Sequence, residues 1–345
     1  VFRRAISQDV FINLDMEQYA HKDFLLRAFE ELVMEDEFRR YPHFGIVIQA
    51  YLRDAVEDVD KLILFARQRG TPFTIRLVKG AYWDFEVVYA RQKGWPIPVF
   101  LNKKESDASF ETCSRRIIDG YPHLRVAIGS HNVRSIAATL AYAKSKNLDP
   151  RALEVQMLFG MADAIKRALV RDGYRLREYA TIGELIPGMA YLVRRLLENT
   201  SNESFLRSKF ADNVSTDILL KSPFEELIAS SGVPVRDPAR FENEPPVDFA
   251  VRTRREEMHK AFSDWKARLG KTYPVMIDGR EIKTARTIAS INPSRQTEVL
   301  GQVGVAGIAE AELAITAAKN AAQTWSKTTA QERARLLDAL ADRMS

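Results

Sequence analysis

The chain has 345 residues, 46% of them hydrophobic, so it can form two domains or one large barrel around a full core. Lysine and arginine together number 51 and aspartate and glutamate 46, and these charges are interspersed, which argues against nucleic-acid binding. The single cysteine, Cys113, excludes an intrachain disulfide framework and a cysteine-rich metal site, and we interpret it as structural or incidental.

The single cysteine fits a reducing cytoplasm best. The sequence contains no apolar run long enough to span a bilayer and no signal peptide, so we do not expect a protein that is integral to a membrane. The small excess of basic residues allows only a weak attraction to anionic lipids. The chain starts at Val1 without a methionine and stops at Ser345 within an apparent helix, so we expect both ends to be cuts through something longer.

Short apolar runs alternate with helix-like segments through the first half of the chain. The expected strands are Phe11–Asp15, Gly45–Tyr51, a run that begins at Thr74, Arg125–Ser130, Leu153–Leu158 and Leu176–Ala180. The expected helices are Lys22–Arg39, Ala55–Arg69, Ala108–Ile118, Val133–Lys146 and Ala162–Arg171, with a long connection through Trp95, Pro96 and Pro98 before the third. This alternation indicates parallel strands joined by crossover helices, either in a doubly wound sheet or in a (β/α)8 barrel.

Polar side chains at the strand ends favour one of these folds. They lie at or near the carboxyl ends of the expected strands: Asp15, Gln49, Arg76, His131, Gln156 and Tyr179. Barrel enzymes collect their functional groups at that end, and no GxGxxG follows the early strands to support a dinucleotide-binding sheet. We therefore predict an α/β fold with a TIM-like (β/α)8 barrel that lacks its first strands.

The stretch Thr74–Glu86, TIRLVKGAYWDFE, carries charges inside an apolar run. In a strand, Ile75 and Leu77 would face one way, and Arg76 and Val78 the other. A buried guanidinium without a partner is unfavourable. Either an acidic side chain neutralises it, or it points at an electron-rich ligand that the following glycine lets approach the backbone. The lysine of this run, on the opposite face, has no explanation at this level.

Two adjacent arginines, Arg194 and Arg195, lie on an apolar-faced helix expected over Pro187–Asn199. Arg194 and Glu198 are four residues apart, so a solvated, salt-bridged face is the plain interpretation. A pair of guanidiniums can also grip a carboxylate through two parallel hydrogen bonds. That alternative predicts a substrate with a carboxylate group.

The other strand-end groups are each ambiguous. An aspartate there can cap a helix, amides can satisfy backbone groups inside the barrel, and a histidine can be an ordinary strand-end residue. Together with Tyr51, Tyr82 and Tyr179 they suit a flat conjugated cofactor better than a metal or a phosphate alone. The histidines show no HExxH or paired ligand spacing that would indicate a metal.

The composition changes after about Ser201, where prolines punctuate a polar region that we interpret as a linker. The elements expected after the linker are a hairpin over Tyr273–Ser290 that turns at Asp278–Gly279, and two amphipathic helices over Ile308–Met344 that split near Thr328 and Thr329. No catalytic pattern is evident in this part.

These motifs resemble a known family. FINLD, VIQAY, IRLVKGAYWD, SHN, EVQMLFGM and YLVRRLLEN occur in the order found in the proline dehydrogenase domain of the proline utilization A family, which are bifunctional flavoenzymes of proline catabolism. Residues from about 260 onward, as in VMIDGREIKTARTIASINP, are similar to the start of the second module, a glutamate semialdehyde dehydrogenase of the aldehyde dehydrogenase superfamily. We therefore expect a barrel over 1–210, a linker or helical connection over 211–260 and the beginning of an aldehyde dehydrogenase fold over 261–345.

The resemblance implies a distorted barrel with FAD at the strand carboxyl ends and hydride transfer from L-proline to flavin N5, giving pyrroline-5-carboxylate. The implied flavin contacts are Gln49, Arg76, Val78, Gly80, Lys103, Ser130, His131, Asn132, Gln156 and Glu198. The implied substrate contacts are Arg194 and Arg195 for the carboxylate, with Asp15, Tyr82, Leu158 and Tyr179 around the ring. Among these, Arg76, Asp15 and Tyr179 are the residues expected to act in catalysis. Leu101 and Ser130 stand where the family has threonine beside the cofactor.

Electrons would pass to a membrane quinone, which implies transient contact with the inner face of the cell membrane. The full-length parent is expected to be a homo-oligomer, with NAD serving only the second module. The first barrel strands are expected before Val1 and the catalytic cysteine of the second module beyond Ser345, so the chain alone would expose strand edges and lack that second reaction. Two alternatives stay open: a flavin barrel oxidoreductase with another small substrate, and a degenerate barrel that serves as a scaffold.

Overall fold

The computed structural model describes residues 1–184, 186, 188, 189, 193, 215–225, 233 and 243–344. The chain divides into two units, Val1–Arg254 and Arg255–Ser345, and each is described by itself. None of the helices within the described ranges is long and apolar enough to cross a membrane.

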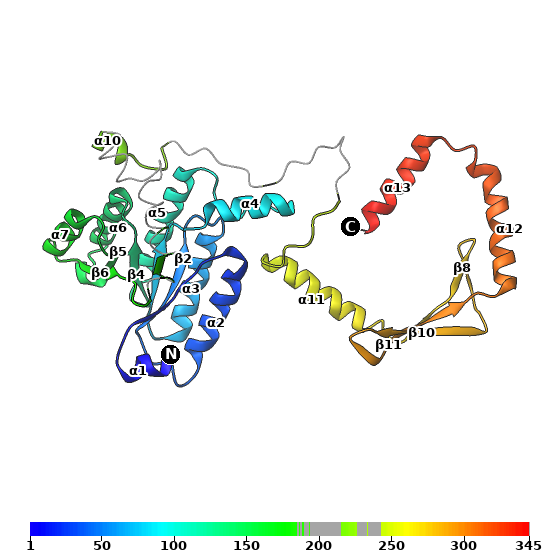
Figure 1. The fold of residues 1–345 in the computed structure, drawn as a ribbon, viewed down its shortest axis with the longest axis horizontal. Helices are drawn as coiled ribbons and strands as arrows, with labels where there is room; N and C mark the ends of the chain where they lie inside the picture. Colours follow the sequence, from blue (N-terminus) through cyan, green and yellow to red (C-terminus); the bar gives the residue numbers. More distant parts are fainter. Residues whose placement is uncertain are drawn as a thin grey trace. The chain divides into compact units, whose positions relative to one another are not determined.

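The first unit is built on six parallel strands whose order in the sheet follows their order in the sequence (Figure 1). They are β1 Ile12–Leu14, β2 Phe44–Gln49, β3 Phe73–Val78, β4 Leu124–Gly129, β5 Glu154–Leu158 and β6 Arg175–Tyr179. The sheet curls and brings its two edges toward each other. The guanidinium of Arg177 on β6 lies 5.0 Å from the ring centroid of Phe11, which comes just before β1. The result is an open half-barrel with a concave and a convex face, and the predicted α/β barrel class is confirmed.

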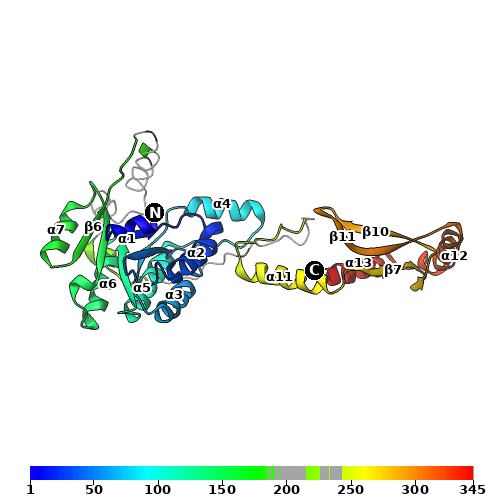
Figure 2. The ribbon, with the colours of Figure 1, turned by 90° about the horizontal axis from the view of Figure 1, so that it is seen from below.

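Helices cover the convex face of this sheet, as Figure 2 shows for α2, α3 and α5. The helices of the unit are α1 Phe2–Ser7, η1 Tyr19–His21, α2 Lys22–Met34, α3 Ala55–Arg69, α4 Trp83–Lys93, α5 Lys103–Asp119, α6 Val133–Ser145, η2 Pro150–Ala152, α7 Asp163–Arg171 and α10 Thr216–Leu219. Phe29 of α2 meets Phe73 of β3 edge to face at 5.2 Å between ring centroids, and both rings are fully buried. The core of the unit therefore lies between the sheet and the helices. Cys113 of α5 is buried in this core, in keeping with a structural role.

Helices α2 and α5 differ from their expected boundaries, and α4 was not expected. Helix α2 ends at Met34, because Glu35 leaves the helix with an extended backbone. Helix α4 occupies part of the stretch expected to be a connection. Its own apolar and charged side chains are spread over all sides of the helix, so its sequence shows little helical periodicity. Helix α5 begins at Lys103, earlier than expected, because the Asn102 side chain caps it by accepting a hydrogen bond from the backbone N of Lys104 at 2.9 Å.

The second unit is mostly antiparallel sheet and helix. Its elements are β7 Lys271–Tyr273, β8 Val275–Ile277, β9 Arg280–Ile282, β10 Arg286–Asn292, β11 Arg295–Val305, α12 Ile308–Trp325 and α13 Ala330–Met344, while α11 Arg252–Lys266 crosses the unit boundary. The turn between β8 and β9 has Asp278 at φ 53° and Gly279 at φ 71°, the two left-handed positions that a tight hairpin needs. The predicted turn and the split of the last two helices are confirmed. The hairpin is shorter than expected, since β10 pairs with β11 instead.

Candidate functional site

The concave face of the half-barrel carries side chains in rows across neighbouring strands. One row runs through Gln49, Val78, Gly129, Gln156 and Arg177, which the strand register places side by side. Side chains at one register position face the same side of a sheet. On β3 the alternate side chains, Ile75 and Leu77, are fully buried against the helices. The predicted alternation of this strand is confirmed, and Arg76 lies on the concave side.

Arg76 reaches from β3 toward the ends of β1 and β6. Its Nη1 donates a hydrogen bond to Asp15 Oδ1 at 3.0 Å, and its guanidinium carbon lies 5.9 Å from the ring centroid of Tyr179. The Asp15 side chain is 61% exposed, but that of Arg76 is only 19% exposed. The Nε atom of Arg76 is buried and has no hydrogen-bond partner among the residues that the structure describes. The structure therefore shows the acidic partner at one nitrogen of this guanidinium, and the alternative of an electron-rich ligand stays a prediction.

Gln49 ends β2 beside this group and is 3% exposed. Its Nε2 donates to the backbone oxygens of Met16 at 3.2 Å and Glu17 at 3.0 Å. Its Oε1 is buried and has no hydrogen-bond partner in the described part of the chain. Within the described ranges, the concave face thus holds a buried acceptor and a buried donor that lack protein partners, and buried polar atoms normally have partners.

Gly80 follows β3 with φ +128°, a conformation that side chains rarely adopt. A Cβ atom there would lie 2.4 Å from Cδ1 of Tyr51. The observed close approach is therefore that of a protein ring, where the sequence suggested a ligand. Burial raises the pKa of the Tyr51 phenol. Tyr82 follows as the residue before α4.

Lys79, which the sequence left unexplained, faces the helices and forms an ion pair with Asp107 of α5. Its Nζ also lies 5.8 Å from the ring centroid of Phe110. Burial lowers the pKa of Lys79, and Asp107 partly offsets that effect. Lys103 Nζ lies 3.9 Å from the other oxygen of Asp107. The carboxylate of Asp107 therefore links Lys79 to Lys103, the lysine that the resemblance places at the cofactor.

The loop after β4 is ordered by its own side chains. Ser130 Oγ accepts from the backbone N of Asn132 at 3.1 Å, and Asn132 Oδ1 caps α6 by accepting from the backbone N of Ser135 at 3.1 Å. His131 Nε2 accepts from the backbone N of Leu158 at 3.1 Å. The loop is thereby tied to the end of β5, where the register pairs Leu158 with Tyr179.

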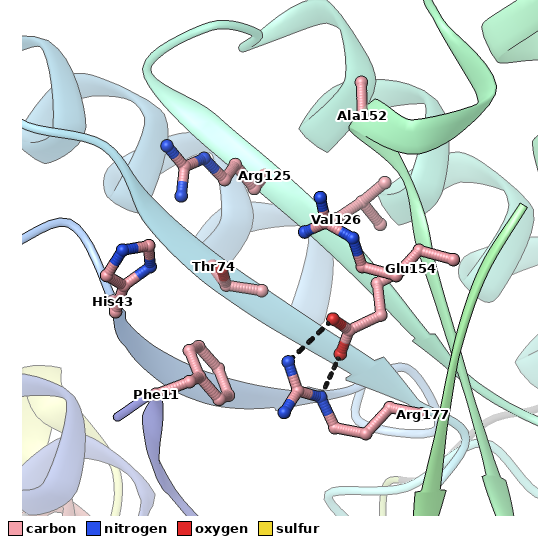
Figure 3. Close-up of a pocket in the computed structure, with 9 residues that line it drawn as sticks. Phe11, His43, Thr74, Arg125, Val126, Ala152, Glu154 and Arg177 are labelled. Atoms are coloured by element: carbon pink, nitrogen blue, oxygen red, sulfur yellow. Dashed lines mark hydrogen bonds and ion pairs between the residues drawn. The ribbon is translucent and has the colours of Figure 1, made fainter. Parts of the chain in front are cut away.

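The sequence analysis missed a charge pair on β5 and β6 (Figure 3). Glu154 is 8% exposed and accepts from Arg177 Nε at 2.7 Å and Nη2 at 2.9 Å. Gln156 Nε2 donates to Glu154 Oε1 at 2.7 Å. Burial raises the pKa of Glu154, but these hydrogen bonds outweigh it, so that pKa lies below its usual value. The alternation of Glu154 with Gln156 along one strand is the signal that could have found it.

This pair borders a small cavity of about 60 Å³ toward the amino ends of the strands. His43, Thr74 and Arg125 also line it (Figure 3). The cavity lies at the amino end of the sheet, and the Arg76 and Asp15 pair lies at the opposite end. Residues at the amino end of a barrel commonly serve stability.

Seven of the predicted residues meet at the carboxyl end of the concave face: Asp15, Gln49, Arg76, Val78, Gln156, Leu158 and Tyr179. Lys103 lies apart from them, against α5's own Asp107. Arg194, Arg195 and Glu198 lie outside the residues that the structure describes. No group of three or more His, Cys, Asp or Glu side chains in the described ranges is arranged to hold a metal ion.

A parallel half-barrel whose strand ends gather a carboxylate, amides and a guanidinium belongs to the class of α/β barrel enzymes. Residues 1–208 match the family model described as proline dehydrogenase, and residues 281–345 match that of the aldehyde dehydrogenase family. The chain belongs to the proline dehydrogenase family.

Several relatives match nearly the whole length of this chain. A crystal structure of proline utilization A from Bdellovibrio bacteriovorus, inactivated by N-propargylglycine, is 51% identical, with a TM-score of 0.86, over 99% of this chain and 36% of that one. The bifunctional protein PutA of Escherichia coli is 30% identical over 95% of this chain and 26% of its own length. The PutA protein of Klebsiella aerogenes is 29% identical over 96% of this chain and 26% of its own length. The resemblance seen in the motifs is confirmed, and the chain spans about a quarter of the length of these curated relatives.

Proposed function

We propose that the first unit forms the active site of an FAD-dependent proline dehydrogenase, which oxidises L-proline to pyrroline-5-carboxylate and passes the electrons to a membrane quinone. The observation that carries this proposal is the buried Nε of Arg76, which has no hydrogen-bond partner among the described residues, beside Asp15 at the carboxyl end of the concave face, in a chain of this family. Membership of the family supports the substrate class.

The residues on the concave face fit a flavin chemically. An isoalloxazine ring presents acceptors at N5 and its carbonyl oxygens and a donor at N3. Arg76 Nε and Gln49 Oε1 are a buried donor and a buried acceptor that lack partners within the described residues, so such a ring would satisfy both. Gly129 lies close to these groups, because a Cβ atom on it would be 2.8 Å from Val78 Cγ1 and 3.6 Å from Arg76 Nε, so this position has no room for a side chain.

When bound, FAD supplies the hydride acceptor for the oxidation. Proline loses a hydride from the ring carbon next to nitrogen and a proton from the nitrogen, and a C=N bond forms. Arg76 holds a fixed positive charge at the reaction centre, Asp15 orients its guanidinium, and the Tyr179 ring flanks it. A charge held in place beforehand stabilises developing negative charge more than mobile water does. Arg194 and Arg195 would hold the proline carboxylate.

The second unit belongs, in this proposal, to an aldehyde dehydrogenase module that oxidises glutamate semialdehyde with NAD in a longer protein. The match of residues 281–345 to that family supports it. We further propose a cytoplasmic homo-oligomer that touches the inner face of the membrane to reach the quinone.

The first test is the absorbance spectrum of the full-length protein that contains this chain. Bound flavin should absorb in the visible range, and proline added without oxygen should bleach it. Arg76→Lys keeps the charge but removes Nε and the forked geometry, so kcat/KM for proline should fall about 10- to 100-fold, as expected for one charge-assisted hydrogen bond. Arg171→Lys, at a side chain 79% exposed, is the control. Protein without flavin, or with flavin that proline cannot reduce, would overturn the proposal.

A further inference from the structure

Glu86 is a buried carboxylate in the first turn of α4 with no role in the proposed function so far. Only 4% of the residue is exposed, and its Oε1 accepts a hydrogen bond from the backbone N of Tyr19 at 2.8 Å. Burial raises the pKa of Glu86, and the Tyr19 N–H lowers it in part. A carboxylate in such surroundings needs a donor, and this donor lies 67 residues away in the sequence.

Tyr19 closes the loop that carries Asp15. The loop leaves β1 at Asp15 and enters η1 at Tyr19. Gln49 holds the first part of the loop, because its side chain donates hydrogen bonds to the backbone oxygens of Met16 and Glu17. Lys22 holds its far end, because its Nζ forms ion pairs with Asp54 at 2.5 Å and with the buried Asp58 of α3 at 2.6 Å. The contact of Tyr19 with Glu86, which we call the latch, holds the part between these two anchors.

The ion pair of Asp15 with Arg76 is too weak to position this loop. Asp15 is 61% exposed, and ion pairs open to water contribute little by themselves. The position of Asp15 therefore depends on the anchors of the loop more than on its attraction to Arg76. Among these anchors, Glu86 stands at the start of the helix that follows β3, and β3 carries Arg76. The latch joins the strand–helix unit of Arg76 to the loop of Asp15.

We propose that Glu86 is a positioning residue, which fixes the backbone of Tyr19 and so keeps Asp15 within hydrogen-bonding distance of Arg76. The consequence for turnover rests on the proposed function; the consequence for the loop does not. Without the acceptor, the Tyr19 N–H turns to water, the loop samples other conformations, and the Arg76 guanidinium loses its fixed orientation.

Two variants of similar volume test this proposal in the full-length protein. Glu86→Gln keeps an oxygen acceptor for the Tyr19 N–H, whereas Glu86→Met fills the same space without one. Glu86→Met should lower kcat/KM for proline about 10- to 100-fold, as a small misplacement of a catalytic group does. Glu86→Gln should stay close to the parent. In an Asp15→Ala background, Glu86→Met should have almost no further effect, because it acts through Asp15.

Hydrogen exchange of the Tyr19 amide provides a readout that needs no turnover. This amide should be protected in the parent and in Glu86→Gln, and should exchange faster in Glu86→Met. A Tyr19 amide that is unprotected in the parent overturns the latch, and this test remains even if Glu86→Met does not fold. An equal loss of activity with and without Asp15 also overturns it, because it points to a general loss of folded protein. A parent without proline oxidation, but with a protected Tyr19 amide, would refute only the proposed function.

Discussion

Charged side chains on the concave face have specific partners, and each partner decides what the charge can do. Glu154 is buried, but the Arg177 side chain that binds it through two nitrogens is 48% exposed. Water therefore weakens the charge attraction, and the forked hydrogen bonds matter more. This pair closes the curl of the sheet, since Arg177 also lies against Phe11.

Glu154→Gln should destabilise the first unit by about 1–2 kcal/mol at neutral pH, because it removes the charge from bonds to Arg177. The folded state holds the pKa of Glu154 below its unfolded value. Its contribution to stability is therefore present above the unfolded pKa and is lost as pH falls through the folded pKa. The difference between parent and variant should shrink below about pH 4. Urea unfolding at several pH values measures it.

Glu35→Gln is the matched control, since Glu35 is exposed at the end of α2. Its stability should differ little from that of the parent at any of these pH values. At low pH the protonated Glu154 of the parent and the glutamine of the variant are both neutral. A difference in stability between the two proteins that persists unchanged there would contradict the assigned ionisation of Glu154.

At the scale of elements, the turn from β3 into α4 brings several functional parts together. β3 carries Arg76, α4 carries Glu86, and the turn between them passes over the buried Tyr51 ring at Gly80. A residue with a Cβ atom at Gly80 would meet both an unfavourable backbone conformation and this ring. The turn therefore depends on tertiary packing as well as on its own sequence.

Gly80→Ala should lower the free energy of unfolding by about 3 kcal/mol, the sum of backbone strain and overpacking. Gly160→Ala is the comparison, because Gly160 also has a positive φ, +77°, but a Cβ atom on it would meet no atom of the described residues beyond its chain neighbours within 4 Å. That variant should lose only about 1–2 kcal/mol. Thermal or urea unfolding measures both. Equal losses at the two glycines would show that the Tyr51 ring plays no part.

At the scale of the whole molecule, the two units differ in how much apolar surface they bury. The first has a continuous core of fully buried aromatic and aliphatic side chains. In the second, neither α12 nor α13 has a buried residue, and Leu337 is 66% exposed. An amphipathic helix normally gains its stability by covering such a face. The second unit therefore has little local stability of its own.

Hydrogen exchange of the 345-residue chain should show this difference directly. Amides of β2 and β3 should exchange only through global unfolding, whereas those of α12 and α13 should exchange through local opening, at least about 100-fold faster. Mass spectrometry of proteolytic fragments measures the rates. Protection of α12 equal to that of β3 would contradict the prediction. In the full-length protein, α12 should become protected if the rest of an aldehyde dehydrogenase module covers it.

Much of the fold and part of the site could be predicted from local patterns. The order of strands and helices, the hairpin turn at Asp278–Gly279 and the concave position of Arg76 all follow from periodicity and turn preferences within short windows. The motifs also predicted the family, which the comparisons confirm. The proposed domain limits and the roles of Arg194 and Arg195 stay predictions. Helix α4 was missed because its sequence has no clear apolar face.

The sequence by itself determined which groups reach the carboxyl end of the sheet. Only the tertiary structure decided their partners. The contacts in question are Arg76 with Asp15, Lys79 with Asp107 and Tyr19 with Glu86, which lie 61, 28 and 67 residues apart. Such pairs depend on how far the sheet curls and how each helix packs on it, and that geometry is a property of the whole core, which no local window of sequence encodes.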